Sequence, residues 1–147
     1  MKTFIKFIII SILSLITFFQ NSFSSEKIKI GLIVPLSGIY SQLGKTIVKS
    51  VRLAVNKIDD DRIEIIPKDT KSNPINSLRS SKELYEQGVR IVIGPVFNES
   101  TKYLDELKDM TFISLTNKIY GNPSNVISAG VNAISQINTI KKFKKIN

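Results

Sequence analysis

The feature that most constrains the fold is a regular alternation of short apolar runs with amphipathic segments. The run IKIGLIVP at residues 28–35 is almost continuously apolar, which is typical of a strand buried on both faces of a parallel sheet. Shorter apolar runs, also of strand length, follow at residues 63–67, 89–94, 111–115 and 126–129. Segments with apolar residues at helical spacing lie at residues 44–58, 73–88, 100–108 and 135–145.

The second helical segment also carries start and stop signals. Asn73 followed by Pro74 predicts an N-cap and a first helical residue, and Gly88 predicts the C-terminal end. The order of strands and helices predicts right-handed crossovers and a parallel sheet. We therefore expect an α/β fold, a Rossmann-like parallel sheet with helices on both faces. The acidic run at residues 59–61 is expected to be a solvated turn.

Composition excludes several classes of function. The 147 residues include no His and no Cys, so zinc fingers, iron–sulfur sites, thiol nucleophiles and His-based triads are ruled out. We predict no catalytic residue, because the acids Asp69 and Glu99 have no visible partner for acid–base chemistry. We also predict no cofactor and no metal site: composition alone leaves a carboxylate-only Mg²⁺ or Ca²⁺ site open, but no EF-hand spacing is present. The segment from Gly38 to Thr46 resembles a phosphate-binding loop, but its spacing is one residue too long.

The net charge of +9 is concentrated at the two ends of the chain. Residues 25–140 contain 15 basic and 12 acidic residues, so the central part of the chain is only weakly basic. A nucleic-acid-binding protein needs a concentrated basic face, often with aromatic residues for stacking. We therefore expect no nucleic-acid partner.

The first 24 residues have the three parts of a signal peptide. Residues 1–6 are basic, residues 7–19 are mainly apolar, and Ser22 and Ser24 occupy the −3 and −1 positions of a cut after Ser24. An uncleaved membrane anchor is the alternative, but the apolar run is short for a spanning helix. We predict a cleavable signal at residues 1–24 and an exported, periplasmic product. Without Cys, the product cannot be a lipoprotein.

Polar loops follow the predicted strands. In parallel α/β sheets, ligands bind at the carboxyl ends of the strands, which directs attention to residues 36–44, 69–70, 95–101 and 116–118. These loops are rich in hydroxyl and amide groups and open helices, whose N-termini suit carboxylates or phosphates. Ser100 and Thr101 are candidate donors to such a ligand. Alternatively, Asn98 or Ser100 only caps the following helix.

The same segments, in this order and spacing, carry a resemblance to a known family. The run IKIGLIVPLSGIYSQLGKTIVKSVRLAVNKI, then Asp69-Thr70, the run GVRIVIGPV and the run FISLT resemble type I periplasmic binding proteins of the leucine/isoleucine/valine-binding class. The resemblance implies one lobe of a two-lobed clamshell that closes on a solute and signals to an ABC-type membrane permease. It places the N-terminal lobe at residues 25–133. The start of a crossover to a second lobe would lie at residues 134–147.

The resemblance also implies where a solute would bind. A small hydroxyl residue of the family, just after the third strand, corresponds to Asn98, and an aromatic residue of the first loop corresponds to Leu43, with Tyr40 nearby. A small residue and a hydroxyl after the fourth strand correspond to Thr116 and Lys118. Lys118 could pair with an anion or could be a solvated loop lysine. The predicted ligand-binding set is Ser37, Tyr40, Leu43, Asn98, Ser100, Thr101, Thr116 and Lys118.

A second family shares part of the pattern. The segment Pro35-Leu36-Ser37-Gly38, together with Asp69-Thr70, the run IGPV and Asn117, is similar to penicillin-binding-protein activators. This resemblance implies a scaffold that binds a cell-wall synthase instead of a small solute. Both families imply a second lobe that is not in this sequence, so we expect a fragment or truncated reading frame, with residues 135–147 fraying in isolation.

Overall fold

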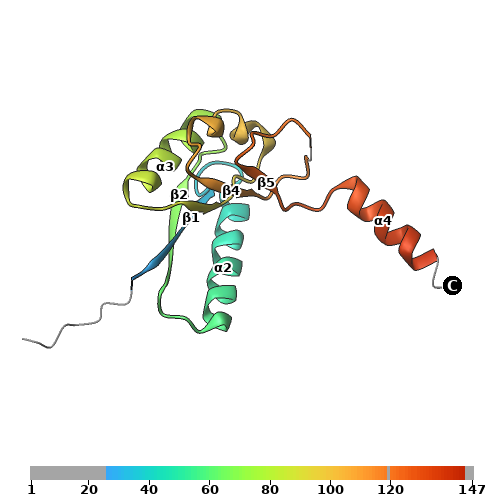
Figure 1. Ribbon diagram of the computed structural model, residues 1–147, viewed down its shortest axis with the longest axis horizontal. Coiled ribbons are helices and arrows are strands. Elements are labelled where there is room, and N and C mark those ends of the chain that lie inside the picture. Colours follow the sequence, from blue (N-terminus) through green and yellow to red (C-terminus); the bar gives the residue numbers. More distant parts are fainter. Residues whose placement is uncertain (1–25, 119, 145–147) are drawn as a thin grey trace, which may run out of the picture.

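The chain folds around a five-stranded parallel sheet. The computed structural model describes residues 26–118 and 120–144 (Figure 1). All strand pairs are parallel, and the strand order is β2-β1-β3-β4-β5, which confirms the expected Rossmann-like α/β fold. The elements are β1 (Ile28–Val34), α2 (Ser41–Ile58), β2 (Ile63–Asp69), α3 (Pro74–Glu86), β3 (Ile91–Ile93), the 3₁₀ helices η1 (Asn98–Thr101) and η2 (Leu104–Glu106), β4 (Thr111–Ser114), β5 (Val126–Ser128) and α4 (Ala133–Lys144).

Helices α2 and α3 contact the same two strands from opposite sides. Both helices pack on β1 and β2, and Figure 1 shows them on either side of these strands. Helix α3 begins as the sequence predicts, because the Asn73 side chain accepts hydrogen bonds from the N–H groups of Ile75 and Asn76. The α2 side of β3 and β5 is more open, with Ile91 45% and Ile127 57% exposed. Cover on both faces is thus confirmed for β1 and β2.

The core lies on the α3 side of the sheet. Ile33, Val92 and Phe112 come from three adjacent strands, and each is fully buried. They pack with Leu84 from α3 and Leu104 from η2, both also fully buried. Removal of this apolar surface from water is the main force that closes α3 and the two 3₁₀ helices over the sheet.

The predicted helix at residues 100–108 is wrong. The segment instead forms η1 and η2, with N–H groups bonded three residues back, as from Leu107 to Leu104. The Asn125 amide nitrogen donates to the carbonyl oxygens of Leu104 and Leu107, at 2.8 and 2.9 Å. These carbonyls are therefore satisfied from the segment before β5, which favours short 3₁₀ turns over a continuous α-helix.

Two glycines bring loops close to the sheet. A Cβ atom at Gly44, in the first turn of α2, would overlap the carbonyl oxygen of Pro35. Gly94 has φ of 107°, and a Cβ atom there would overlap the carbonyl oxygen of Ile33. Only glycine allows both approaches, so the loops after β1 and β3 are held against the end of β1.

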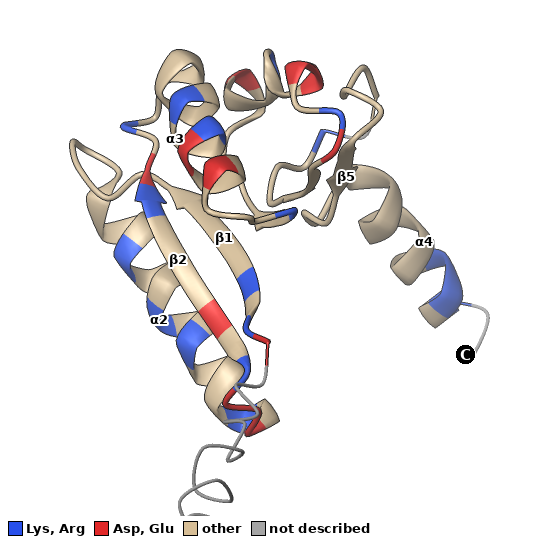
Figure 2. Ribbon diagram, turned by 60° about the vertical axis from the view of Figure 1, so that its left-hand side comes forward, with Lys and Arg blue, Asp and Glu red and all other residues tan. Residues whose placement is uncertain are grey.

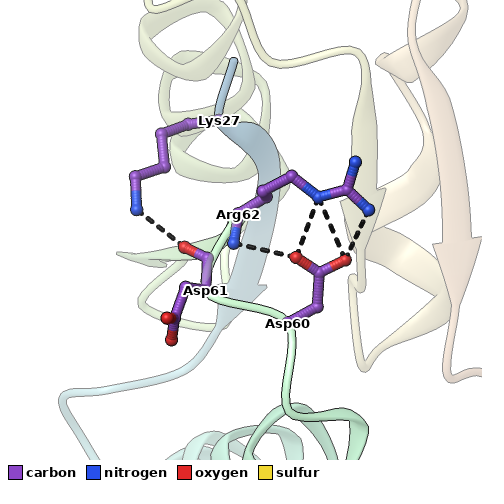
Figure 3. Close-up of polar contacts among 4 residues, drawn as sticks. All are labelled: Lys27, Asp60, Asp61 and Arg62. Carbon is purple, nitrogen blue, oxygen red and sulfur yellow. Dashed lines mark hydrogen bonds and ion pairs between the residues drawn. The ribbon is translucent and has the colours of Figure 1, made fainter. Parts of the chain in front are cut away.

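The turn between α2 and β2 is exposed, as predicted for the acidic run, and it carries an ion pair. The Asp60 carboxylate accepts hydrogen bonds from Arg62 Nη2 at 2.7 Å and Arg62 Nε at 2.9 Å (Figure 3). These side-chain bonds, with that from the Arg62 N–H, lower the pKa of Asp60 to about 2. Lys27 Nζ donates to the carbonyl oxygen of Asp61 at 2.7 Å, so the start of β1 is tied to the same turn (Figure 3).

Helix α4 extends away from the sheet (Figure 1). Its start is fixed by a reciprocal pair, in which Ser135 N–H donates to Asn132 Oδ1 and Asn132 N–H donates to Ser135 Oγ. All of its side chains are exposed. The expected fraying of this segment stays a prediction. The predicted signal peptide at residues 1–24 lies outside the described residues. Among the residues that the structure describes, no helix has the length and apolar character needed to span a bilayer.

Candidate functional site

The loop after β1 is anchored by Asp69, the last residue of β2. The Asp69 carboxylate accepts hydrogen bonds from the N–H groups of Leu36 and Lys71, each at 2.8 Å. Partial burial by itself would raise the pKa of Asp69, but hydrogen bonds from Ser37, Lys71 and Leu36 outweigh it and hold this pKa below its usual value. Ser37, a predicted ligand residue, therefore also interacts with Asp69.

An aromatic contact joins the loops after β1 and β3. The ring centroids of Tyr40 and Phe97 lie 4.8 Å apart, with the planes tilted by 54°. Tyr40 is 44% exposed and Leu43, one turn along, is 42% exposed. The pair gives the carboxyl edge of the sheet an apolar surface that a ligand can reach.

The loop after β3 leads directly into η1. Thr101 is buried, and its hydroxyl donates to the carbonyl oxygen of Asn98 at 2.8 Å. The N-cap position of η1 is occupied by Phe97 and not by Asn98 or Ser100, and no side chain caps η1. The Asn98 Oδ1 and Ser100 Oγ atoms are buried and lack hydrogen-bond partners among the described residues. The capping interpretation of Asn98 and Ser100 is therefore wrong.

The loop after β4 holds Lys118 in a defined position. The Lys118 N–H donates to Thr116 Oγ1 at 3.2 Å, and the Lys118 carbonyl oxygen accepts from Asn122 Nδ2 at 3.0 Å. Thr116 itself is buried, and its carbonyl oxygen accepts from Ser128 Oγ at 2.8 Å. The Lys118 ammonium lies beside Gly121, where a larger residue would contact it. Thr116 thus holds the loop in place, and the exposed ammonium group of Lys118 gives the loop a positive charge.

A cavity of about 500 Å³ opens between η1, η2, Lys118 and residues 121–123. It brings together three of the predicted residues, Asn98, Thr101 and Lys118. The remaining five predicted residues do not line it: Ser37, Tyr40, Leu43, Ser100 and Thr116. Of these, only Ser100 and Thr116 belong to the segments after β3 and β4 that contribute to the cavity.

The predicted set lacks the other six residues of the cavity wall, among them Asp105 and Asn122. Asp105 and Asn122 line it, one on η2 and one on the loop that precedes β5. Asp105 falls in the segment predicted as a continuous helix, and that error hid its position. For Asn122 the sequence offers no signal, because the course of the β4–β5 loop depends on tertiary contacts.

Comparison with known proteins decides the family. The sequence profile of the family described as Periplasmic binding protein matches residues 27–143. The chain belongs to the periplasmic binding protein family. The resemblance of the sequence to type I periplasmic binding proteins is thereby confirmed.

Solved periplasmic binding proteins share the fold. A solute binding protein of an ABC transporter from Rhodopseudomonas palustris, in complex with 3,4-dihydroxy benzoic acid, is 28% identical, with a TM-score of 0.57; the match covers 61% of this chain and 27% of that protein. A branched-chain amino acid transporter substrate binding protein from Streptococcus pneumoniae, in complex with isoleucine, is 25% identical, with a TM-score of 0.61. The match covers 69% of this chain and 33% of that protein. An ABC-type branched-chain amino acid transporter from R. palustris is 22% identical, with a TM-score of 0.62. The match covers 72% of this chain and 33% of that protein.

The chain thus spans about a third or less of the length of these solved proteins. A comparison with curated protein sequences gives no match.

Proposed function

We propose that this chain is a solute-binding lobe of an extracytoplasmic receptor for an ABC-type transporter. The observation that carries the proposal is the cavity at the carboxyl edge of the sheet, in a chain of the periplasmic binding protein family. Three loops from three different strands meet at this edge, which is where parallel α/β sheets bind ligands. The lobe binds a small molecule and performs no chemistry on it.

The groups at this edge suit a small carboxylate. Lys118 offers an exposed ammonium group, and the side-chain amide of Asn98 offers N–H donors. Tyr40 and Phe97 do not line the cavity, but their ring pair provides an apolar surface at the same edge of the sheet. Two of the solved relatives were crystallised with carboxylates, 3,4-dihydroxy benzoic acid and isoleucine. An amino acid or a related carboxylate is therefore the solute class we propose.

The proposal includes the location and partners of the protein. Residues 1–24 would direct export and be removed, so that the lobe works outside the cytoplasm. A membrane permease would receive the solute. Further contacts to the solute would come from outside this lobe, because the match covers only 27% and 33% of the length of two of the solved relatives.

Calorimetric titration of the full chain tests the proposal. Leucine, isoleucine, valine and 4-hydroxybenzoate are titrated into the wild type and into Asn98→Ala, with Asn56→Ala on exposed α2 as the matched control. We expect saturable binding of at least one solute, weakened by Asn98→Ala and unchanged by Asn56→Ala. Absence of saturable binding to every solute would overturn the proposal, as would equal effects of the two substitutions. Binding of a cell-wall synthase domain without any solute would favour the activator-like alternative.

A further inference from the structure

Helix α2 carries positive charge that is not neutralised within the described part of the chain. The helix contains no Asp or Glu, and its four cations are Lys45, Lys49, Arg52 and Lys57. Figure 2 shows only basic bands along α2. The three ion pairs found within residues 26–118 and 120–144 all take their cations from outside this helix.

Three of these cations form a stripe along one side of α2. Lys45, Lys49 and Arg52 follow one another at spacings of four and three residues, which places them on the same side of a helix. They extend over about 10 Å of the helix axis, and all three are exposed. Like charges at these spacings repel one another and weaken a helix, so the stripe is better explained by binding than by stability.

The stripe borders a hollow with apolar residues in its wall. The hollow has a volume of about 360 Å³, and its wall includes all three cations of the stripe. The wall also includes Val48 of α2, Leu36 of the loop after β1 and Pro67 of β2, each of them half-buried. Lys and Arg can lay their alkyl stems along apolar surface while their charged ends stay in water. The hollow therefore combines an apolar interior with a cationic border.

The hollow is separate from the cavity proposed to bind solute. The two share no lining residue. The hollow lies against β2 and the solute cavity against the loop that precedes β5, and these two strands form opposite edges of the sheet. A ligand at α2 would therefore meet a different surface from the solute.

We propose that the stripe and the hollow form a docking surface for an acidic helical segment of a partner protein. Carboxylates at the same spacing on a helix packed alongside α2 would pair with Lys45, Lys49 and Arg52, and one apolar side chain between them would enter the hollow. A flat anionic bilayer could meet the three cations but would leave the hollow unfilled. The inference goes beyond the proposed function, because it assigns a protein-binding surface to a part of the lobe that the solute does not use.

Designed peptides test the charge and the apolar contact. Two fluorescently labelled, alanine-rich helical peptides are titrated with the full chain, one with Glu at i, i+4 and i+7 and one with Glu at i, i+3 and i+7. These match the stripe in its two possible directions, and each peptide has one leucine on the same face. Control peptides replace every Glu by Gln, or the leucine by alanine. We expect one Glu peptide to bind saturably, about tenfold more tightly than either of its controls, and to bind less tightly as salt is added.

Two charge reversals on the same helix locate the site. Lys49→Glu should weaken binding of that peptide about tenfold, whereas Lys57→Glu should change it little, because Lys57 is exposed on α2 but does not line the hollow. The two variants have the same net charge, so long-range attraction affects them equally. Thermal midpoints check that both variants fold. A peptide whose middle Glu is replaced by Lys should bind Lys49→Glu more tightly than it binds the wild type.

Four outcomes would overturn the inference. They are absence of saturable binding to both Glu peptides, equal affinity for the Glu and Gln peptides, equal losses in Lys49→Glu and Lys57→Glu, and equal affinity for the leucine and alanine peptides. Binding to phosphatidylglycerol vesicles without binding to either peptide would also overturn it, and would identify α2 as a membrane-facing surface instead.

Discussion

The N–H group of Leu36 and the carboxylate of Asp69 are joined by a hydrogen bond of 2.8 Å that connects the ends of two parallel strands. Asp69 ends β2, directly beside Val34 of β1, and Leu36 lies in the loop that follows β1. Through this bond an acid at the carboxyl edge of the sheet fixes the loop that carries Ser37 and Tyr40. Asp69 therefore positions the loop after β1 and is not itself among the cavity residues.

Loss of the Asp69 charge should destabilise the fold. Asp69→Asn weakens charge-assisted hydrogen bonds to Leu36 and Lys71, and bonds to charged groups contribute about 1.5–3 kcal/mol. We expect urea denaturation at neutral pH to show a loss of about 1–3 kcal/mol. Asp61→Asn, in the exposed turn before β2, is the control and should cost much less. Equal losses for the two variants would contradict the anchoring role.

The close approach at Gly44 reverses the usual effect of alanine in a helix. Alanine normally stabilises an exposed helix position by up to about 1 kcal/mol relative to glycine. A Cβ at Gly44 would overlap the Pro35 carbonyl oxygen, so α2 or the loop after β1 must shift, at a cost of about 1–3 kcal/mol. Thermal and urea unfolding should therefore show Gly44→Ala less stable than wild type, with Asn56→Ala unchanged or slightly more stable. A stabilised Gly44→Ala would disprove the packing described for this turn.

The ion pair at Asp60 predicts a specific acid dependence. Its pKa of about 2 in the folded chain lies below the ordinary 3.8, so the unfolded chain takes up the proton first as the pH falls. The stabilisation is therefore fully present above about pH 4 and is lost as the pH falls toward 2. Stability measured against pH should fall less steeply in this window for Asp60→Asn than for the wild type. Identical slopes would show that the pair contributes nothing.

The two faces of the sheet differ in how deeply their side chains are buried, and this difference can be measured by mutation. Phe112 is fully buried on the α3 side, whereas Ile127, on the neighbouring strand β5, is 57% exposed on the other side. Phe112→Ala should cost about 3–5 kcal/mol because it leaves a cavity in the core. Ile127→Ala should shift the urea midpoint far less. Comparable shifts would mean that the α2 side of β5 is covered in solution.

The strands and two long helices could be predicted from the sequence because their signals are local. A continuous apolar run at residues 28–35 and the Asn73–Pro74 start of α3 specify these elements without knowledge of their neighbours. The 3₁₀ helices could not be predicted this way. Their geometry depends on the side chain of Asn125, which bonds the Leu104 carbonyl from 21 residues away.

The candidate site, too, has some features that follow from local sequence signals and others that depend on contacts between distant residues. Loop positions at the carboxyl edge follow from strand order, and three of the predicted ligand residues in these loops, Asn98, Thr101 and Lys118, line the cavity. That they bind a ligand stays a prediction. The role of Asp69 as an anchor, and the place of Asp105 in the cavity wall, depend on how loops fold over the sheet. From the sequence, Asp69 was an acid without a visible partner, and Asp105 fell in the segment predicted as a continuous helix.

The most direct test of the solute-binding account is an amide chemical-shift titration of the isotope-labelled 16.5 kDa chain with leucine, isoleucine, valine and 4-hydroxybenzoate. The account predicts saturable shifts that cluster on the amides of Asn98, Lys118 and Gly121, with α2 unaffected. Shifts confined to α2 or α4, or no saturable shift with any of these solutes, would contradict it.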